Sequence, residues 1–146
     1  MSFTGLRQPI SQVMRVKFTI PANSPAGTTV IGEITTDPAL QPTQVLTVPA
    51  NEVWHIVDIY AESTSDIGVD GYVDLYINEL RQNLRFGPLG QTLKTLLNAI
   101  RLRQAVVIDR LSRLQFVFTT RSATGASAVT TTITVEVVRV PVAPVR

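Results

Sequence analysis

Residues 52–62 read EVWHIVDIYAE and form the most regular strand pattern in this 146-residue chain. Successive side chains of a β-strand point to opposite faces of a sheet, so a period of two is typical of a strand. We assign the odd-numbered residues to the core and the even-numbered residues to the outer face. The inward set would be Val53, His55, Val57, Ile59 and Ala61, and the outward set Trp54, Ile56, Asp58, Tyr60 and Glu62.

Strand patterns continue on both sides of this segment. Turns rich in proline, glycine and asparagine separate them, as between the strands of an all-β fold. We predict strands over 14–20, 28–36, 45–48, 72–77, 84–86, 105–109, 114–120 and 129–140, with Asn78-Glu79 as a hairpin turn. Their inward residues would include Val16, Phe18, Ile20, Val73, Leu75, Ile77, Leu114, Phe116, Phe118, Thr120, Thr131, Ile133, Val135 and Val137.

One stretch departs from the strand pattern. Within residues 91–100, the apolar positions Leu93, Leu96, Leu97 and Ile100 follow the i, i+3, i+4, i+7 spacing of a helix face. We therefore expect one short helix inside an all-β, two-sheet antiparallel β-sandwich. A jelly roll fits the many strands best, and an immunoglobulin-like sandwich remains open. Residues 1–13 would form an extended N-terminal arm, 14–140 the sandwich domain and 141–146 an extended tail.

The chain carries little reactive chemistry. It has no Cys, His55 is its only His, and its net charge is +2. A metal site needs several His, Cys or carboxylate ligands, and a nucleophile needs an activating base. We expect His55 to be neutral and packed, and we expect no enzyme activity, cofactor or metal. Asp66, Asp70 and Asp74 favour solvated loop carboxylates, with a Ca²⁺ site as the alternative.

Membranes and nucleic acids are not expected partners. No stretch approaches the roughly 18 apolar residues of a membrane span, and the first ten residues lack the pattern of a secretory signal. The arginines in the middle of the chain are interleaved with aliphatic residues and have few aromatic neighbours for stacking bases, so ion pairs within the fold or to a protein partner are favoured. They are Arg81, Arg85, Arg101, Arg103, Arg110, Arg113 and Arg121.

Four aromatic residues are predicted on outward faces: Trp54, Tyr60, Tyr72 and Tyr76. Large exposed apolar patches mark interaction sites, and aromatic residues are enriched in interface cores. The alternatives are that the arm or a loop of the same chain covers these rings, or that they stack on sugars. The pattern therefore indicates a protein that acts through its surfaces.

The segments QVLTVPANEVWHIVDIYAES, GYVDLYINE and TTTITVEVVRVPV resemble small jelly-roll proteins of virus particles. More narrowly, the chain resembles the auxiliary, or decoration, proteins that cover the capsids of long-tailed phages of thermophilic bacteria. That resemblance implies a homotrimer on the outer capsid surface, where hexamers of the major capsid protein meet. It also implies that a terminal arm, here residues 1–12 or 140–146, ties a subunit to its neighbour or to the shell.

We therefore expect a structural virion protein that stabilises a phage capsid, with itself and the major capsid protein as partners. Deletion of residues 1–12 should weaken attachment while leaving the sandwich folded. The alternatives are a single-jelly-roll major capsid protein and a carbohydrate-binding sandwich. The residues expected at protein interfaces are Phe3, Leu6, Arg7, Ile10, Trp54, Tyr60, Val142, Pro144 and Val145.

Overall fold

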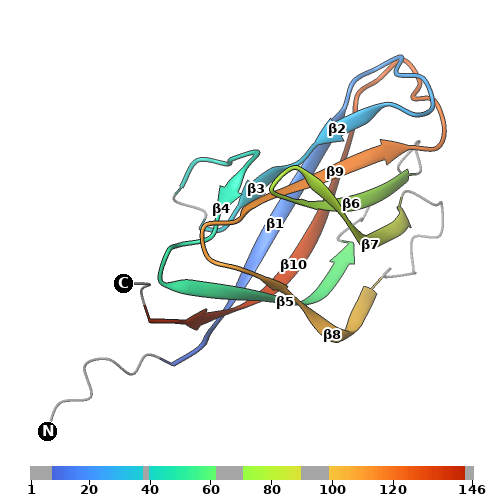
Figure 1. The fold of residues 1–146 in the computed structure, drawn as a ribbon. Coiled ribbons are helices and arrows are strands. Elements are labelled where there is room, and N and C mark those ends of the chain that lie inside the picture. Colours follow the sequence, from blue (N-terminus) through green and yellow to red (C-terminus); the bar gives the residue numbers. More distant parts are fainter. Residues whose placement is uncertain (1–7, 38–39, 62–70, 90–98, 144–146) are drawn as a thin grey trace, which may run out of the picture.

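The structure, a computed structural model, describes residues 8–37, 40–61, 71–89 and 99–143 (Figure 1). These residues form ten β-strands and no helix. The strands are β1 (Ile10–Ile20), β2 (Thr29–Ile31), β3 (Glu33–Thr35), β4 (Leu46–Thr47), β5 (Glu52–Ala61), β6 (Gly71–Ile77), β7 (Leu80–Leu89), β8 (Ala99–Ile108), β9 (Arg113–Thr120) and β10 (Val129–Pro141).

The strands form two antiparallel sheets that pack face to face as a β-sandwich, which confirms the predicted fold class. Sheet A has the order β3-β1-β10-β5-β8, and sheet B has the order β2-β9-β6-β7, with β4 also paired to β9. In Figure 1 the strands of sheet B pass in front of β1 and β10. Each sheet buries one face, so each strand should alternate between core and outer positions.

The strand pairing is nested along the chain. The first strand pairs with the last (β1 with β10), and moving inward β2 pairs with β9, β5 with β8 and β6 with β7. Two further ladders, β10 with β5 and β9 with β6, join these pairs into the sheets. Most of these pairings connect segments that are distant in sequence, whereas β6 and β7 form a local hairpin. The fold therefore depends on many non-local pairings.

The core lies between the two sheets. Phe18 of β1 and Phe118 of β9 meet across it with ring centroids 5.6 Å apart. The predicted inward residues of β1, β9 and β10 are all buried, which confirms the predicted core faces of those strands. In β10 the alternation is interrupted, because Thr134 is buried as well. In β6, Val73 and Leu75 are buried as predicted, and Ile77 is partly buried against the core.

Several boundaries differ from prediction. β7 and β8 are longer than the strands predicted over 84–86 and 105–109. Strand β1 begins at Ile10, so residues 10–13 pair with β10 although they were expected in the arm. The helix predicted over 91–100 falls largely outside the described residues, and its last two residues, Ala99 and Ile100, begin β8 as strand rather than helix. Spacing alone favoured a helix there, but both residues pair with β5, and sheet pairing overrides such local patterns.

The segment predicted as one strand over 28–36 is two strands in two sheets. It pairs with β9 as β2, crosses the sandwich at Gly32, and pairs with β1 as β3. A side chain at Gly32 would collide with Val16 and Phe18. The Gly32 amide donates to the Phe116 carbonyl at 2.8 Å. Glycine is needed at this crossing because the backbone passes directly over packed side chains.

In β5 the predicted faces are wrong over its first half. Trp54 and Ile56 are buried, whereas Val53 and His55 are only half-buried. Val57 is an extra residue in the ladder with β10, because Ile56 pairs with Val137 and Asp58 with Glu136. Such a bulge inverts the alternation. The prediction is therefore correct again after it, where Ile59 is buried.

The predicted hairpin turn at Asn78-Glu79 is confirmed. Ile77 pairs with Leu80 across a two-residue loop, and Asn78 and Glu79 have φ angles of 51° and 68°. Positive φ at both central residues is the mark of a type I′ turn, whose twist matches that of the flanking strands.

Candidate interaction surfaces

Three of the predicted interface residues lie at one end of the sandwich, where both chain ends leave the fold (Figure 1). Ile10, Arg139, Trp54 and Ile108 form one row across sheet A, from β1 through β10 and β5 to β8. Val142 follows β10 at the same end. We call this region the terminal end and define it by Ile10, Glu52, Trp54, Leu111, Arg139 and Val142.

Trp54 does not face outward as predicted. Its side chain is only 4% exposed. The indole Nε1 donates a hydrogen bond to Glu52 Oε1 at 3.0 Å, and the Arg139 guanidinium lies 5.6 Å from the ring centroid. A buried indole needs a partner for its single N–H. Trp54 is therefore part of the core at the terminal end, where it contacts Glu52 and Arg139.

Arg139 and Glu52 form a bidentate ion pair beside this ring. Arg139 Nε and Nη2 donate to the two Glu52 oxygens at 2.8 and 2.7 Å, and Arg139 Nη1 donates to Gln12 Oε1 at 2.9 Å. Gln12 in turn donates to the Thr36 carbonyl at 3.2 Å. Hydrogen bonding to Glu52 raises the pKa of Arg139, against the opposing effect of burial. The planar fork therefore fixes β10, β5 and β1 to one another.

The chain after β10 runs along its own subunit. The Val142 amide donates to the Asn51 carbonyl at 2.9 Å, and Arg110 Nη1 donates to the Ala143 carbonyl at 3.0 Å. Val142, half-buried, thus has contacts within the chain. Ile10 remains 54% exposed at the start of β1. The other predicted terminal residues lie outside the described residues: Phe3, Leu6, Arg7, Pro144 and Val145.

Leu111 is a further surface residue, and sequence analysis missed it. It lies in the loop between β8 and β9, is 60% exposed and has a φ of 62°. Its amide donates to the Val48 carbonyl at 2.9 Å, which holds this conformation. A left-handed backbone disfavours a branched residue, and strained residues concentrate at functional sites. The sequence DRLS at residues 109–112 could have indicated this residue, because a leucine among polar residues in a tight turn is unusual.

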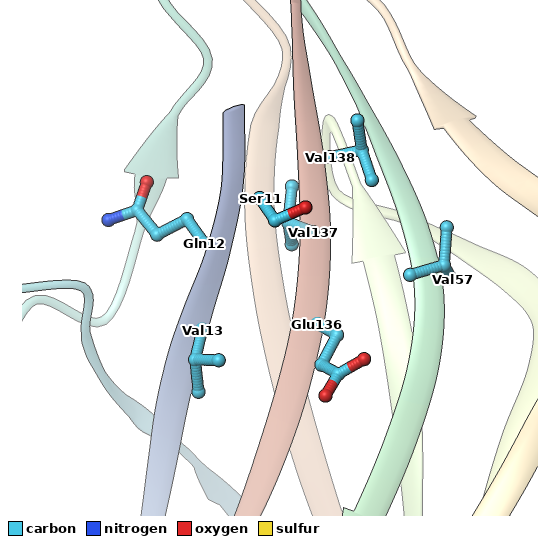
Figure 2. A pocket seen from close by; sticks show the side chains of 7 residues that line it. All are labelled: Ser11, Gln12, Val13, Val57, Glu136, Val137 and Val138. Carbon is cyan, nitrogen blue, oxygen red and sulfur yellow. The ribbon is translucent and has the colours of Figure 1, made fainter. Parts of the chain in front are cut away.

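A shallow groove lies on the outer face of sheet A next to the terminal end (Figure 2). Its cavity volume is about 180 Å³. The bulge at Val57 shapes it, and Val13 on β1 is 47% exposed. Figure 2 shows Val57 and Val138 on the side of β5, with Val13 and Glu136 below them. The lining residues are Ser11, Gln12, Val13, Val57, Glu136, Val137 and Val138.

Tyr60 and His55 both belong to this outer face. Tyr60 is half-buried, and its hydroxyl donates to Glu136 Oε1 at 3.3 Å. His55 was expected in the core, but the bulge places it in a row between Val138 and Val107. Val107 is 56% exposed. The outer face of sheet A thus presents an apolar strip, made of Val13, Val57, Val138 and Val107, beside a few polar groups.

The outer face of sheet B has a different character. Asp74 of β6 is 4% exposed, and both of its oxygens accept from Arg85 of β7, at 2.9 and 3.1 Å. This hydrogen bonding raises the pKa of Arg85. Arg85 and Arg121 also lie over the Tyr72 ring, 5.0 and 5.4 Å from its centroid. Asp74 is therefore a buried, paired carboxylate and not the solvated one predicted; Asp66 and Asp70 lie outside the described residues.

Ligand-rich sites are not found in the part of the chain that the structure describes. Within it, no three His, Cys, Asp or Glu side chains gather in a way that could hold a metal ion. The same residues include no helix of the length and apolar character that would cross a bilayer. No known protein-family model matches the chain, and no curated protein is significantly similar to it.

Proposed function

We propose that this protein is a non-enzymatic structural protein of a virus particle. It decorates the outer surface of a phage capsid as a homotrimer and stabilises the shell by bridging neighbouring capsomers of the major capsid protein. The proposal joins the resemblance described above to the way the chain is wound.

The nested strand pairing is the observation that carries this proposal. Eight strands paired first with last and then inward behave as one long hairpin that is rolled into a sandwich. The resulting orders are β1-β10-β5-β8 in sheet A and β2-β9-β6-β7 in sheet B, with β3 added at an edge. This winding is expected of a jelly roll, an architecture that recurs in viral capsid proteins. Fold alone does not fix function, so the surfaces must also be consistent.

The terminal end provides a surface that suits attachment. Ile10 and Leu111 expose more than half of their side chains there, and the chain continues from the same end toward residues 1–9. Leu111 keeps its exposed position despite an unfavourable backbone conformation. Exposed apolar side chains at this end can add contact area to a neighbour without enlarging the domain. Three such contacts in a trimer would act together and raise avidity.

The structure argues against one of the two alternative functions and leaves the other open. A single-jelly-roll major capsid protein would have the same winding, so assembly must separate the two. A sugar-binding sandwich was expected to stack a pyranose on Trp54, but that ring is buried. Tyr72 is no substitute, because two guanidiniums lie over its ring. We therefore retain only the two capsid hypotheses, a decoration protein and a major capsid protein.

The test combines native mass measurement with capsid binding. We expect the full chain to have three times its 16.0 kDa mass and to co-sediment with preformed capsids of the phage that encodes it. A monomer that binds no capsid would refute the proposal. Self-assembly into closed shells would support the major-capsid reading instead.

The deletion that tests the N-terminal arm should remove fewer residues than 1–12, because β1 begins at Ile10. Removing residues 1–12 would delete part of β1 and the Gln12 contact to Arg139. Removing residues 1–8 leaves the strand intact. We expect this variant to fold with an unchanged melting temperature and to bind capsids more weakly. Unchanged capsid binding would show that the arm is not the attachment device.

A further inference from the structure

The groove on the outer face of sheet A has room for one apolar side chain. Its cavity volume is about 180 Å³, and Val13, Val57 and Val138 line it from three neighbouring strands (Figure 2). An apolar cavity of roughly 150 Å³ can hold a group of the size of benzene, which is larger than the side chain of a leucine. Glu136 adds a carboxylate to the lining, and its Oε1 accepts from the Tyr60 hydroxyl at 3.3 Å.

The turn between β8 and β9 presents such a side chain. Residues 109–113 read DRLSR, and Leu111 is 60% exposed at a φ of 62°. Two hydrogen bonds hold the turn in place: the Leu111 amide donates to the Val48 carbonyl, and the Val48 amide donates to the Ser112 carbonyl, both at 2.9 Å. Leu111 is therefore an exposed apolar side chain on a fixed backbone, which loses less entropy on docking than a mobile loop would.

The turn and the groove are complementary in charge as well as in polarity. Arg113, which is exposed, follows Leu111 by two residues, and Glu136 lies in the groove beside its valines. A carboxylate has about four acceptor positions, of which the hydroxyl of Tyr60 uses one. A guanidinium suits such a carboxylate because its planar fork can donate to both oxygens. The turn thus offers a leucine beside a cation, and the groove offers an apolar recess beside an anion.

The turn and the groove lie on different parts of the subunit. The groove opens on the outer face of sheet A, whereas the turn is bonded to Val48, which directly follows β4 of sheet B. A contact between two different patches is heterologous: it joins subunits head to tail, and it ends when the rotation closes a ring. A cyclic trimer needs a contact of this kind, because a self-complementary patch joins subunits only in pairs.

We propose that the turn at residues 109–113 docks in the groove of a second copy of this chain. Leu111 of one subunit inserts between Val13 and Val57 of the next, and Arg113 pairs with Glu136. Three such contacts close the ring, and this number of subunits rests on the proposed function. The contact itself is argued from the size, polarity and charge of the two patches.

The first experiment traps the contact as a disulfide in the full chain. The protein has no Cys, so introduced cysteines form the only disulfides. The variant Val13→Cys/Leu111→Cys is oxidised mildly and separated without reductant. A disulfide requires the two Cα atoms to lie within about 7 Å, so it reports docking at the groove. We expect covalent species of two and three times the 16.0 kDa chain mass and none larger, because a ring of three has no free end.

Single-cysteine variants and a displaced cysteine are the controls. Val13→Cys alone and Leu111→Cys alone should form no disulfide between subunits, whereas an equal mixture of the two should form a covalent dimer. Val13→Cys/Leu80→Cys is the matched control. Leu80 is 69% exposed and begins β7, which lies two strands from β9 in sheet B, so this variant should stay uncrosslinked.

An exchange of charges tests the ion pair. Arg113→Glu alone and Glu136→Arg alone should each weaken the trimer by about two- to fivefold per contact, as measured by native mass over a dilution series. Arg113→Glu/Glu136→Arg restores the pair in reverse, so its affinity should return to within about twofold of that of the native chain. The Glu136→Arg substitution also removes the acceptor of Tyr60, but the exchange variant shares this loss. Melting temperatures should show that all three variants are folded.

The outcomes separate this inference from the proposed function. A full chain that is a trimer, with no disulfide in Val13→Cys/Leu111→Cys, would overturn the contact and leave the capsid proposal intact. Covalent species larger than three chains would support the contact and contradict the closed trimer. A disulfide in Leu111→Cys alone would show that the turn meets its own counterpart, which would overturn the head-to-tail arrangement. If the exchange variant were no better than Glu136→Arg, the pairing of Arg113 with Glu136 would be refuted.

Discussion

The two ends of the sandwich are closed in different ways. At the end opposite the termini, the loops 21–28 and 121–128 lie side by side (Figure 1). We call this the closed end. Its loops are joined by backbone amides, carbonyls and hydroxyls, whereas the terminal end is joined by an ion pair, an indole and the backbone of the departing chain. One end uses neutral groups and the other uses charges.

Thr124 is the centre of the closed end. Its hydroxyl accepts from the Ser24 amide at 2.6 Å and donates to the Pro21 carbonyl at 2.9 Å. Its own amide donates to the Ser24 carbonyl at 2.9 Å, and the Asn23 amide reaches the Gly125 carbonyl at 2.9 Å. None of the exposed large apolar side chains of the described residues lies in these two loops.

This difference indicates which end is available to partners. The closed end joins its two loops by internal hydrogen bonds, and most of the side chains that it presents to solvent are small. The terminal end leaves Ile10 and Leu111 exposed beside a rigid charged network. A surface that only seals the core has no need of exposed leucine in a strained conformation, whereas a surface that docks does. We therefore expect substitutions to separate stability from attachment at the terminal end but not at the closed end.

The largest effect is expected from Arg139→Met. It removes the partner of Glu52, whose side chain is only 12% exposed, and leaves a carboxylate with reduced hydration. Breaking a buried pair costs about 3–5 kcal/mol, and the partial exposure of this pair lowers our expectation to about 2–3 kcal/mol. Urea denaturation should show this loss in the free energy of unfolding.

Two controls define the cause of that loss. Arg139→Met/Glu52→Gln removes the stranded charge but keeps an acceptor for Trp54, so it should recover part of the stability. Arg139→Lys tests pH. The pKa of Arg139 is raised from an already alkaline value, so the guanidinium stays charged throughout the alkaline range in which a lysine would lose its proton. A lysine at this position should lose its contribution as the pH approaches about 10–11. A parallel loss in the native protein would contradict this assignment.

A smaller effect is expected at the closed end from Thr124→Val. The substitution keeps the shape but leaves the Ser24 amide and the Pro21 carbonyl without their hydroxyl partner. Unsatisfied buried groups cost about 1–3 kcal/mol, and we expect about 2 kcal/mol. Thr119→Val is the matched control, because Thr119 is half-buried on the outer face of β9. Equal losses in the free energy of unfolding for both variants would show that the Thr124 hydrogen bonds at the closed end contribute no more than the hydroxyl of Thr119.

Strands β1 and β9 were predictable because their alternation continues without interruption. Their buried residues follow a strict period of two, as in Leu114, Phe116 and Phe118. In β10 the predicted inward residues are buried too, but Thr134 between Ile133 and Val135 is also buried. In β5 the same reasoning failed between Val53 and Ile56, because the bulge at Val57 has no signature in EVWHIVDIYAE. Either face of that segment is apolar enough to be buried, so only the ladders with β10 and β8 decide which one is.

The candidate surfaces were less predictable than the fold, because they depend on residues that meet only across strands. Asp74 and Arg85 are cross-strand partners in a hairpin whose register shifts between Asp74 and Tyr76. Tyr72 and Arg121 are 49 positions apart in sequence. Ile10 could be placed near the departing arm, but the positive φ of Leu111 could not be inferred from its side chain. Sequence pattern reports on each strand separately, whereas a surface is a property of neighbouring strands.

The smallest effect on stability is expected from Leu111→Asn. This variant is also the sharpest test of the difference between the terminal end and the closed end. Asparagine tolerates the left-handed conformation that Leu111 adopts at a φ of 62°, so the free energy of unfolding should rise by about 0.5 kcal/mol. The exposed leucine side chain is lost at the same time. If the terminal end docks a sister subunit or a shell, the variant should be slightly more stable and yet bind more weakly.

Leu80→Asn is the matched control for this separation. Leu80 is 69% exposed, also follows a turn, and begins β7 on sheet B, which β6 separates from β9 and from the loop that carries Leu111. It lies in a strand, where asparagine is unfavourable, so stability should fall slightly while capsid attachment and native mass stay unchanged. If both leucine variants bound normally, exposure at Leu111 would have no role in docking. If only Leu111→Asn lost capsid attachment, the turn at Leu111 would be identified as a docking contact that the fold maintains at a cost to its own stability.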